Sequence, residues 1–222
     1  MFAGHYAVAY AAPKTAVALP LWVWFAAVQW LDIVFMSLAI LRVEKLRLVE
    51  GFTASNDLDL YYMPFSHGLV GAVVLSLLFA ALVALVFPAG RSPVAMAVVA
   101  LASFSHWVLD LIMHTPDLPL IGDDSTKVGL GLWDHYAIGL AFEVALLVLA
   151  VWLYTRAVTL TERGALLVWG LGGLILVIHL YSQLAPAPPS EKAFAATGLL
   201  AYVLLAAAAA WVERRAVARP PA

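Results

Sequence analysis

The chain has 222 residues, of which 64% are hydrophobic and only 12% are charged, and its formal net charge is −2. Soluble domains are about 45–50% apolar and about 25% charged, so this composition excludes an ordinary soluble domain and indicates an integral membrane protein. The lack of a basic run argues against a nucleic-acid partner, and the absence of cysteine excludes disulfides, thiolate metal ligands and cysteine nucleophiles.

The predicted elements are a short N-terminal half-helix and a series of membrane spans. The first twelve residues lack the basic start of a signal peptide, so we expect them to belong to the mature protein and to pack against the first span. Six apolar stretches are each long enough, at about 20 residues, to cross a bilayer. They lie near residues 19–41, 67–87, 93–113, 132–156, 164–184 and 193–212. The sequence therefore predicts an all-α fold, a polytopic membrane helical bundle that forms a single domain over residues 1–222.

The connections between the spans indicate the orientation, because cytoplasmic loops are enriched in Lys and Arg. The side with both termini holds seven such residues: Lys14, Arg91, Arg156, Arg163, Arg214, Arg215 and Arg219. The opposite side holds five: Arg42, Lys45, Arg47, Lys127 and Lys192. This excess predicts that both termini lie in the cytoplasm, with the polar insert 42–65 and the loop 114–131 outside it.

Several ionisable residues lie in or beside the spans, where a buried charge costs about 2.5–3.5 kcal/mol and usually serves a function. The first span ends after Asp32, the second begins at His67, the third ends after Asp110 and the fourth begins before Glu143. Alternating topology therefore places these groups in the same, non-cytoplasmic half of the membrane. A half-helix about 14 Å long, at about 1.5 Å per residue, would bring His5 to a similar depth. We expect one shared site.

The third span carries the densest group. His106, Asp110 and His114 are spaced four residues apart in SHWVLDLIMHTPDLPL and fall on one helix face. Histidine and aspartate one turn apart can ligate one metal ion or bridge two. The alternative is a His–Asp hydrogen-bonded pair that holds helices together.

The other polar residues have simpler interpretations. We interpret His179, alone on its span, as a packing histidine. His135 stands at the start of the fourth span and is either interfacial or a ligand. Asp123 and Asp124 are interpreted as solvated loop charges.

The order of these residues resembles that in the bacterial inner-membrane metal-dependent hydrolases. The resemblance rests on GHY at 4–6, the intramembrane Asp32, FSHG at 65–68 and SHWVLDLIMHTPDLPL at 105–120, and it covers roughly the first 120 residues. That family is marked by an N-terminal GH, a PDxD-type acidic segment, a THS motif and an SHxxxDxxTP-type helix.

That family is in turn similar to zinc-dependent phospholipase C and the single-strand nucleases of the same fold, in which a helical bundle supplies a ligand series to a zinc cluster. The resemblance implies the series His5, Asp32, His67, His106, Asp110, His114, His135 and Glu143 here. Two departures count against a full cluster. The acidic segment is reduced to the lone Asp32, and the nucleophile-bearing threonine position of THS falls on Phe65-Ser66. Either could mean fewer metal ions or a lost activity.

The sequence thus predicts a membrane-embedded metal-dependent hydrolase in the bacterial inner membrane, with a phosphoester or lipid-linked substrate. A divalent ion, expected to be Zn²⁺ from the N/O ligands, would be held by Asp32, His67, His106 and Asp110. Asp110 is the expected bridge to a second ion, which His5 or His114 would complete. Glu143, in a low-dielectric setting, is the candidate general base or acid.

Two other readings stay open at this point. A transporter or proton or metal-ion channel would also use buried Asp, Glu and His. Against it stand the lack of paired broken helices or an inverted repeat and the single depth of the polar groups. The third reading is a structural membrane protein that keeps a relic site.

Overall fold

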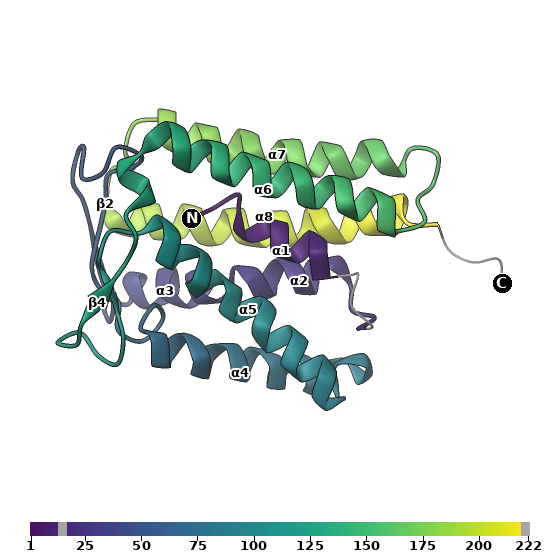
Figure 1. Ribbon diagram of the computed structural model, residues 1–222, viewed down its shortest axis with the longest axis horizontal. Helices are drawn as coiled ribbons and strands as arrows, with labels where there is room; N and C mark the ends of the chain where they lie inside the picture. Colours follow the sequence, from purple (N-terminus) through teal and green to yellow (C-terminus); the bar gives the residue numbers. More distant parts are fainter. Residues whose placement is uncertain (13–16, 219–222) are drawn as a thin grey trace.

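The computed structural model describes residues 1–12 and 17–218. Within them the chain forms eight α-helices and two small two-stranded sheets, which confirms the predicted all-α bundle. The helices run mostly alongside one another, and the strands gather at one end of the bundle (Figure 1). Lys14 and Arg219, which the orientation argument counts, lie outside the described residues.

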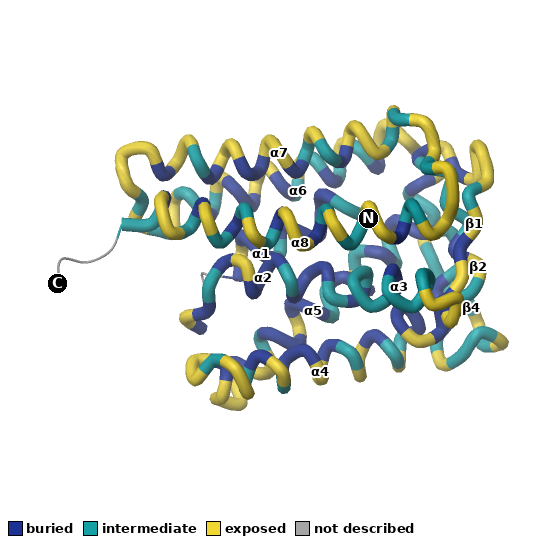
Figure 2. Tube along the Cα trace, turned by 180° about the vertical axis from the view of Figure 1, so that it is seen from behind, coloured by how far each residue is buried: buried dark blue, intermediate teal, exposed yellow. Residues whose placement is uncertain are grey.

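Five helices are long and apolar enough to cross a membrane. They are α4 (Leu69–Val86), α5 (Pro93–Met113), α6 (Tyr136–Ala157), α7 (Gly164–Leu184) and α8 (Glu191–Ala216). Their inward faces are buried and much of their outward surface is exposed, including large Leu and Val side chains (Figure 2). Exposed apolar side chains on helices of this length indicate a multi-pass membrane protein with lipid around it. The predicted bounds of α5 and α7 are correct to the residue.

The first predicted span, residues 19–41, is a broken helix. It consists of α2 (Leu21–Val28) and α3 (Trp30–Ile40), which meet at an angle of 55°. Gln29, between them, has φ −108° and ψ 6°, outside the helical region. The pair counts as a sixth candidate span if its two halves are taken together. The break places Val28 at a helix end in the middle of the bundle.

The N-terminal half-helix is α1 (His5–Ala11), as predicted. It packs against α2, α5 and α6 (Figure 1). Ala3, Tyr6, Ala9 and Tyr10 are almost fully buried in the main core. A seven-residue helix has too few internal hydrogen bonds to be stable alone, so this tertiary packing holds α1 in place.

Two hairpins, which the sequence did not predict, close the end of the bundle at which α3 ends and α4 begins. Strand β1 (Lys45–Leu48) pairs antiparallel with β2 (Leu58–Tyr62), and β3 (Leu118–Pro119) pairs antiparallel with β4 (Lys127–Val128). The hairpins occupy the polar insert 42–65 and the loop after α5. They cover the end of the bundle nearest to the predicted polar residues.

Candidate metal centre

The structure brings together six of the seven predicted site residues. These are His5 of α1, Asp32 of α3, His67 just before α4, His106 and Asp110 of α5, and His114 directly after α5. The four histidines and Asp110 are almost fully buried, and the side chain of Asp32 is 14% exposed. Two overlapping triplets have ligand atoms close enough to hold one metal ion: His5, His106 and Asp110, and Asp32, His67 and His106.

Asp110 stands at the middle of this group. Its Oδ2 lies 3.0 Å from His106 Nε2 and 3.5 Å from His67 Nε2. Its Oδ1 lies 3.2 Å from His5 Nε2 and 3.6 Å from His114 Nε2. The amino group of Met1 also contacts Oδ1, at 2.8 Å. A carboxylate whose two oxygens face two separate pairs of imidazoles can bridge two cations.

The proton of His106 is placed by the broken helix. His106 Nδ1 lies 2.7 Å from the carbonyl oxygen of Val28, the last residue of α2. Because a carbonyl can only accept, Nδ1 must carry a proton, and in the neutral imidazole the lone pair is then on Nε2. That lone pair points into the group of carboxylates, as a metal ligand requires.

His114 is oriented in the same way by Asp117, which was not among the predicted site residues. His114 Nδ1 donates to Asp117 Oδ1 at 2.9 Å, and Thr115 Oγ1 donates to the other carboxylate oxygen at 3.3 Å. The His114 ring also packs on Trp133, with ring centroids 4.0 Å apart. Its Nε2 therefore faces Asp110. The signal in the sequence was a carboxylate three residues after the histidine, in HTPD.

Asp32 is held by a hydrogen bond from α8. Its Oδ1 lies 3.5 Å from His67 Nε2 and 3.6 Å from His106 Nε2. Its Oδ2 accepts a hydrogen bond of 2.6 Å from the hydroxyl of Tyr202 on α8. Nothing in the sequence singled out Tyr202, because it is one tyrosine in an apolar helix. Its bond leaves Oδ1 of Asp32 free to serve as a ligand.

Several ring nitrogens at the centre have no hydrogen-bond partner among the described residues. They are both nitrogens of His5 and Nε2 of His106, and the two rings are stacked 3.7 Å apart at 6°. A buried polar atom without a partner costs about 1–3 kcal/mol. A cation beside the Asp110 carboxylate would satisfy Nε2 of His5 and Nε2 of His106. The donor set of nitrogen and oxygen atoms also suits a divalent metal, so the residues fit such an ion.

Glu143, the seventh predicted residue, lies beside this group and binds the N-terminal segment. Its Oε2 accepts hydrogen bonds from the backbone N–H of Phe2 at 3.0 Å and of Gly4 at 3.1 Å. Its Oε1 is 3.8 Å from His179 Nε2. These contacts make Glu143 an anchor for the residues before His5. Its role as general acid or base stays a prediction.

The remaining candidates lie away from the centre. His135 is exposed at the start of α6 and belongs to neither triplet. His179 is buried, and its ring lies parallel to that of Phe2, with centroids 6.3 Å apart. Asp123 pairs with Lys127 at 2.9 Å, and Asp124 is exposed. These positions agree with the packing and loop interpretations of His179, Asp123 and Asp124.

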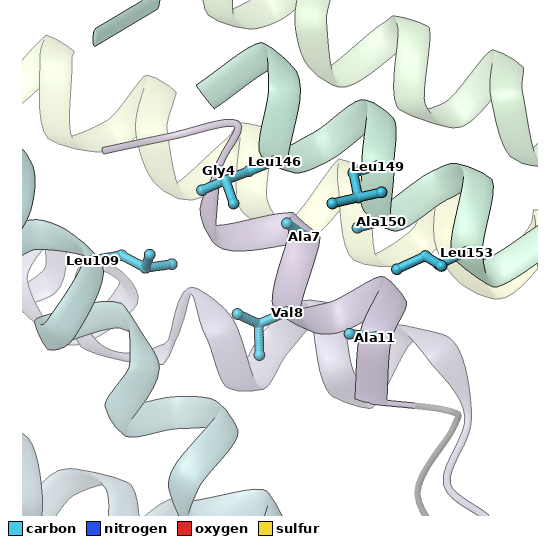
Figure 3. Close-up of a pocket in the computed structure, with 9 residues that line it drawn as sticks. All are labelled: Gly4, Ala7, Val8, Ala11, Leu109, Leu146, Leu149, Ala150 and Leu153. Atoms are coloured by element: carbon cyan, nitrogen blue, oxygen red, sulfur yellow. The ribbon is translucent and has the colours of Figure 1, made fainter. Parts of the chain in front are cut away.

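An apolar groove of about 230 Å³ runs between α5 and α6 outside α1. Figure 3 shows Gly4, Ala7, Val8 and Ala11 along its floor, with Leu109 on one side and residues of α6 on the other. Its lining offers no side chain that could bind a metal ion or an anion. The groove is therefore separate from the metal centre, although His5 and Asp110 directly follow two of its lining residues in the sequence.

No family model, no curated protein and no solved structure matches the chain.

Proposed function

We propose that this protein is a membrane-embedded, metal-dependent hydrolase that acts on a phosphoester or lipid-linked substrate. The observation that carries the proposal is the arrangement around Asp110. One buried carboxylate has two imidazole Nε2 atoms facing each of its oxygens, and Asp32 completes one side. A purely structural His–Asp pair needs one imidazole for one carboxylate. Four histidines around one aspartate exceed that need.

The residues divide into two ligand groups that share Asp110. Asp32, His67, His106 and Asp110 would hold one divalent ion, and Asp110 would bridge it to a second, which His5 or His114 would complete. Zn²⁺ is the ion that we propose, because buried histidine and carboxylate ligands are typical of zinc sites. A divalent ion held there supplies Lewis acidity, which activates water and polarises a phosphoryl or carbonyl oxygen.

The chain itself supplies position and a dry environment. The carbonyl of Val28 and the carboxylate of Asp117 place the protons of His106 and His114 on Nδ1, so that Nε2 can bind a cation. Tyr202 fixes the second oxygen of Asp32. Burial of these groups strengthens every electrostatic interaction with a charged substrate group. Asp32, the most exposed of them, marks the side from which a substrate group would approach.

The location favours a substrate that is itself in the membrane. The centre lies near the end of the bundle that the hairpins cover, and we place this end in the non-cytoplasmic half of a bacterial inner membrane. A headgroup of a lipid reaches that depth without leaving the bilayer. The apolar groove between α5 and α6 offers a surface for an acyl chain next to the segment that carries His5.

The test is hydrolysis by the purified protein in detergent. We expect release of phosphate or headgroup from at least one member of a panel of phospholipids and lipid-linked phosphoesters. A chelator should abolish the release, added Zn²⁺ should restore it, and Asp110→Asn should be inactive. Asp124→Asn, an exposed loop carboxylate, is the matched control. Release that is unchanged in Asp110→Asn would contradict the proposal, and Zn²⁺ or proton flux through proteoliposomes without hydrolysis would point to transport instead.

A further inference from the structure

A buried carboxylate outside the metal centre has no cationic partner among the described residues. Glu44 follows α3 in the chain and is only 1% exposed. Its Oε1 accepts hydrogen bonds from the backbone N–H of Phe65 at 2.8 Å and of Ser66 at 2.9 Å. Its Oε2 accepts from the hydroxyl of Ser66 at 2.5 Å. Burying a carboxylate costs free energy even when it is hydrogen-bonded, so the burial of Glu44 needs a physical reason.

The hydroxyl of Ser66 links Glu44 to the metal centre. Ser66 Oγ lies 2.8 Å from Nδ1 of His67, the next residue. A hydroxyl has one proton to donate, and the Ser66 hydroxyl donates it in the hydrogen bond to Glu44 Oε2. Ser66 Oγ can then only accept from His67, so Nδ1 of His67 carries a proton. In the neutral imidazole the lone pair of His67 is therefore on Nε2, which lies 3.5 Å from both Asp32 Oδ1 and Asp110 Oδ2.

We propose that Glu44 and Ser66 are positioning residues that act on the metal ion through His67. They fix its tautomer, set the direction of its ring and increase the basicity of Nε2. This inference rests on the proposed function, since it assumes that His67 is a metal ligand. The inference goes beyond the proposed function, because it assigns a role to two residues that hold no metal themselves.

Two of the other histidines of the centre support this assignment, whereas Nδ1 of His5 has no hydrogen-bond partner among the described residues. His106 Nδ1 is bound by a backbone carbonyl and His114 Nδ1 by the carboxylate of Asp117. Each of these imidazoles has an acceptor at Nδ1 and turns Nε2 toward Asp110. His67 follows the same rule, but its acceptor at Nδ1 is the hydroxyl of Ser66, which in turn donates to the carboxylate of Glu44. Such outer partners of metal-binding histidines typically change metal affinity about 10–100-fold when they are removed.

A structural role for Glu44 alone makes a different prediction. If Glu44 only ties down the loop through the N–H groups of Phe65 and Ser66, the Ser66 hydroxyl is dispensable. Ser66→Ala keeps both backbone bonds to Glu44 Oε1 and removes the hydroxyl that joins Glu44 Oε2 to His67. This variant therefore separates the two roles.

The experiment is a titration of the metal-free, full-length protein in detergent with Co²⁺, followed by its ligand-field absorption and by competition with Zn²⁺. We expect Ser66→Ala and Glu44→Gln to bind Co²⁺ about 10–100-fold more weakly than the wild type, with an altered absorption spectrum. Glu50→Gln, an exposed carboxylate of the same insert, should bind like the wild type. Imidazole nitrogen NMR of the Zn²⁺-loaded protein should show the Nδ1 proton of His67 protected from exchange in the wild type and not in Ser66→Ala.

The outcomes separate this inference from the proposed function. A wild-type protein that binds no Co²⁺ overturns the metal centre and with it both proposals. A wild-type protein that binds Co²⁺, with Ser66→Ala equal to it in affinity and spectrum, overturns only the role of Glu44 and Ser66. If Ser66→Ala does not fold, Glu44→Gln alone decides, by the same comparison with Glu50→Gln.

Discussion

At the scale of single residues, the ligands of the candidate centre could be predicted from the sequence and most of their partners could not. His106 and Asp110 stand one turn apart in an apolar helix, and a local pattern of that kind needs no tertiary information. Glu44, Tyr202 and Asp117 reach the centre from a loop, a distant helix and a helix end. Glu44 and Tyr202 are close to the centre only because of the tertiary packing.

Glu143 is the residue for which the sequence and the geometry favour different roles. The sequence predicts a general acid or base, whereas the structure shows its Oε2 engaged by two backbone N–H groups. We expect Glu143→Ala to lower the free energy of unfolding by about 2–4 kcal/mol, because it leaves the buried N–H of Gly4 and the partly buried N–H of Phe2 unpaired. Glu143→Gln should cost about 1 kcal/mol, since the amide oxygen still accepts, and should keep most of the hydrolytic activity. Thermal unfolding and substrate hydrolysis measured on both variants check this. Loss of activity in Glu143→Gln at unchanged stability would instead support the acid–base role.

At the scale of elements, helix bounds were predictable where the chain carries a local signal. Helix α5 begins with Pro93 after Ser92, whose hydroxyl accepts from the N–H of Ala95 at 3.1 Å, and Pro at the first helical position after a Ser cap is a strong start signal. The break at Gln29 has no such signal, because neither Pro nor Gly interrupts the apolar run. The hairpins were not predicted, although KLRL at 45–48 and DLDL at 57–60 alternate polar and apolar residues, because each run is only about four residues long within a polar insert. Strands β3 and β4 have two residues each, too few to show any alternation.

The start of α4 gives a prediction about how an element positions a ligand. Gly71 lies in the first turn of α4, where a Cβ atom would collide with the carbonyl oxygen of Phe65. Because the obstacle is backbone in the segment that carries His67, no side-chain rotation can relieve it. We expect Gly71→Ala to destabilise the protein by about 1–3 kcal/mol and to weaken Co²⁺ binding.

Gly173→Ala is the matched control for this change, because a Cβ there has open space around it and the position is equally helical. It should leave melting temperature and Co²⁺ affinity close to those of the wild type. Equal behaviour of Gly71→Ala and Gly173→Ala would show that the contact between α4 and the His67 segment does not position the ligand.

At the scale of the whole molecule, composition alone was enough for the fold class, because an apolar fraction of 64% leaves few alternatives to a membrane bundle. Alternating spans place the polar residues of four separate elements at one depth, so their grouping could be predicted without tertiary information. The orientation depends on a different signal, seven basic residues on one side of the membrane against five on the other.

The absence of cysteine makes this orientation directly testable. Asp124, between β3 and β4, and Glu162, between α6 and α7, are exposed at opposite ends of the bundle. We expect a membrane-impermeant maleimide to label Asp124→Cys in spheroplasts and to label Glu162→Cys only after the membrane is permeabilised. The reverse pattern would place the metal centre in the cytoplasmic half.

The central claim is that the group around Asp110 holds a divalent metal ion, and elemental analysis of the purified protein tests it most directly. We expect bound zinc in the wild type and in Asp124→Asn, and loss of that metal in Asp110→Asn and in His106→Ala. Loss should be accompanied by a lower melting temperature, because an ion that binds only the folded state stabilises it. A wild-type protein free of divalent metal, with unchanged stability in Asp110→Asn and His106→Ala, would contradict the account.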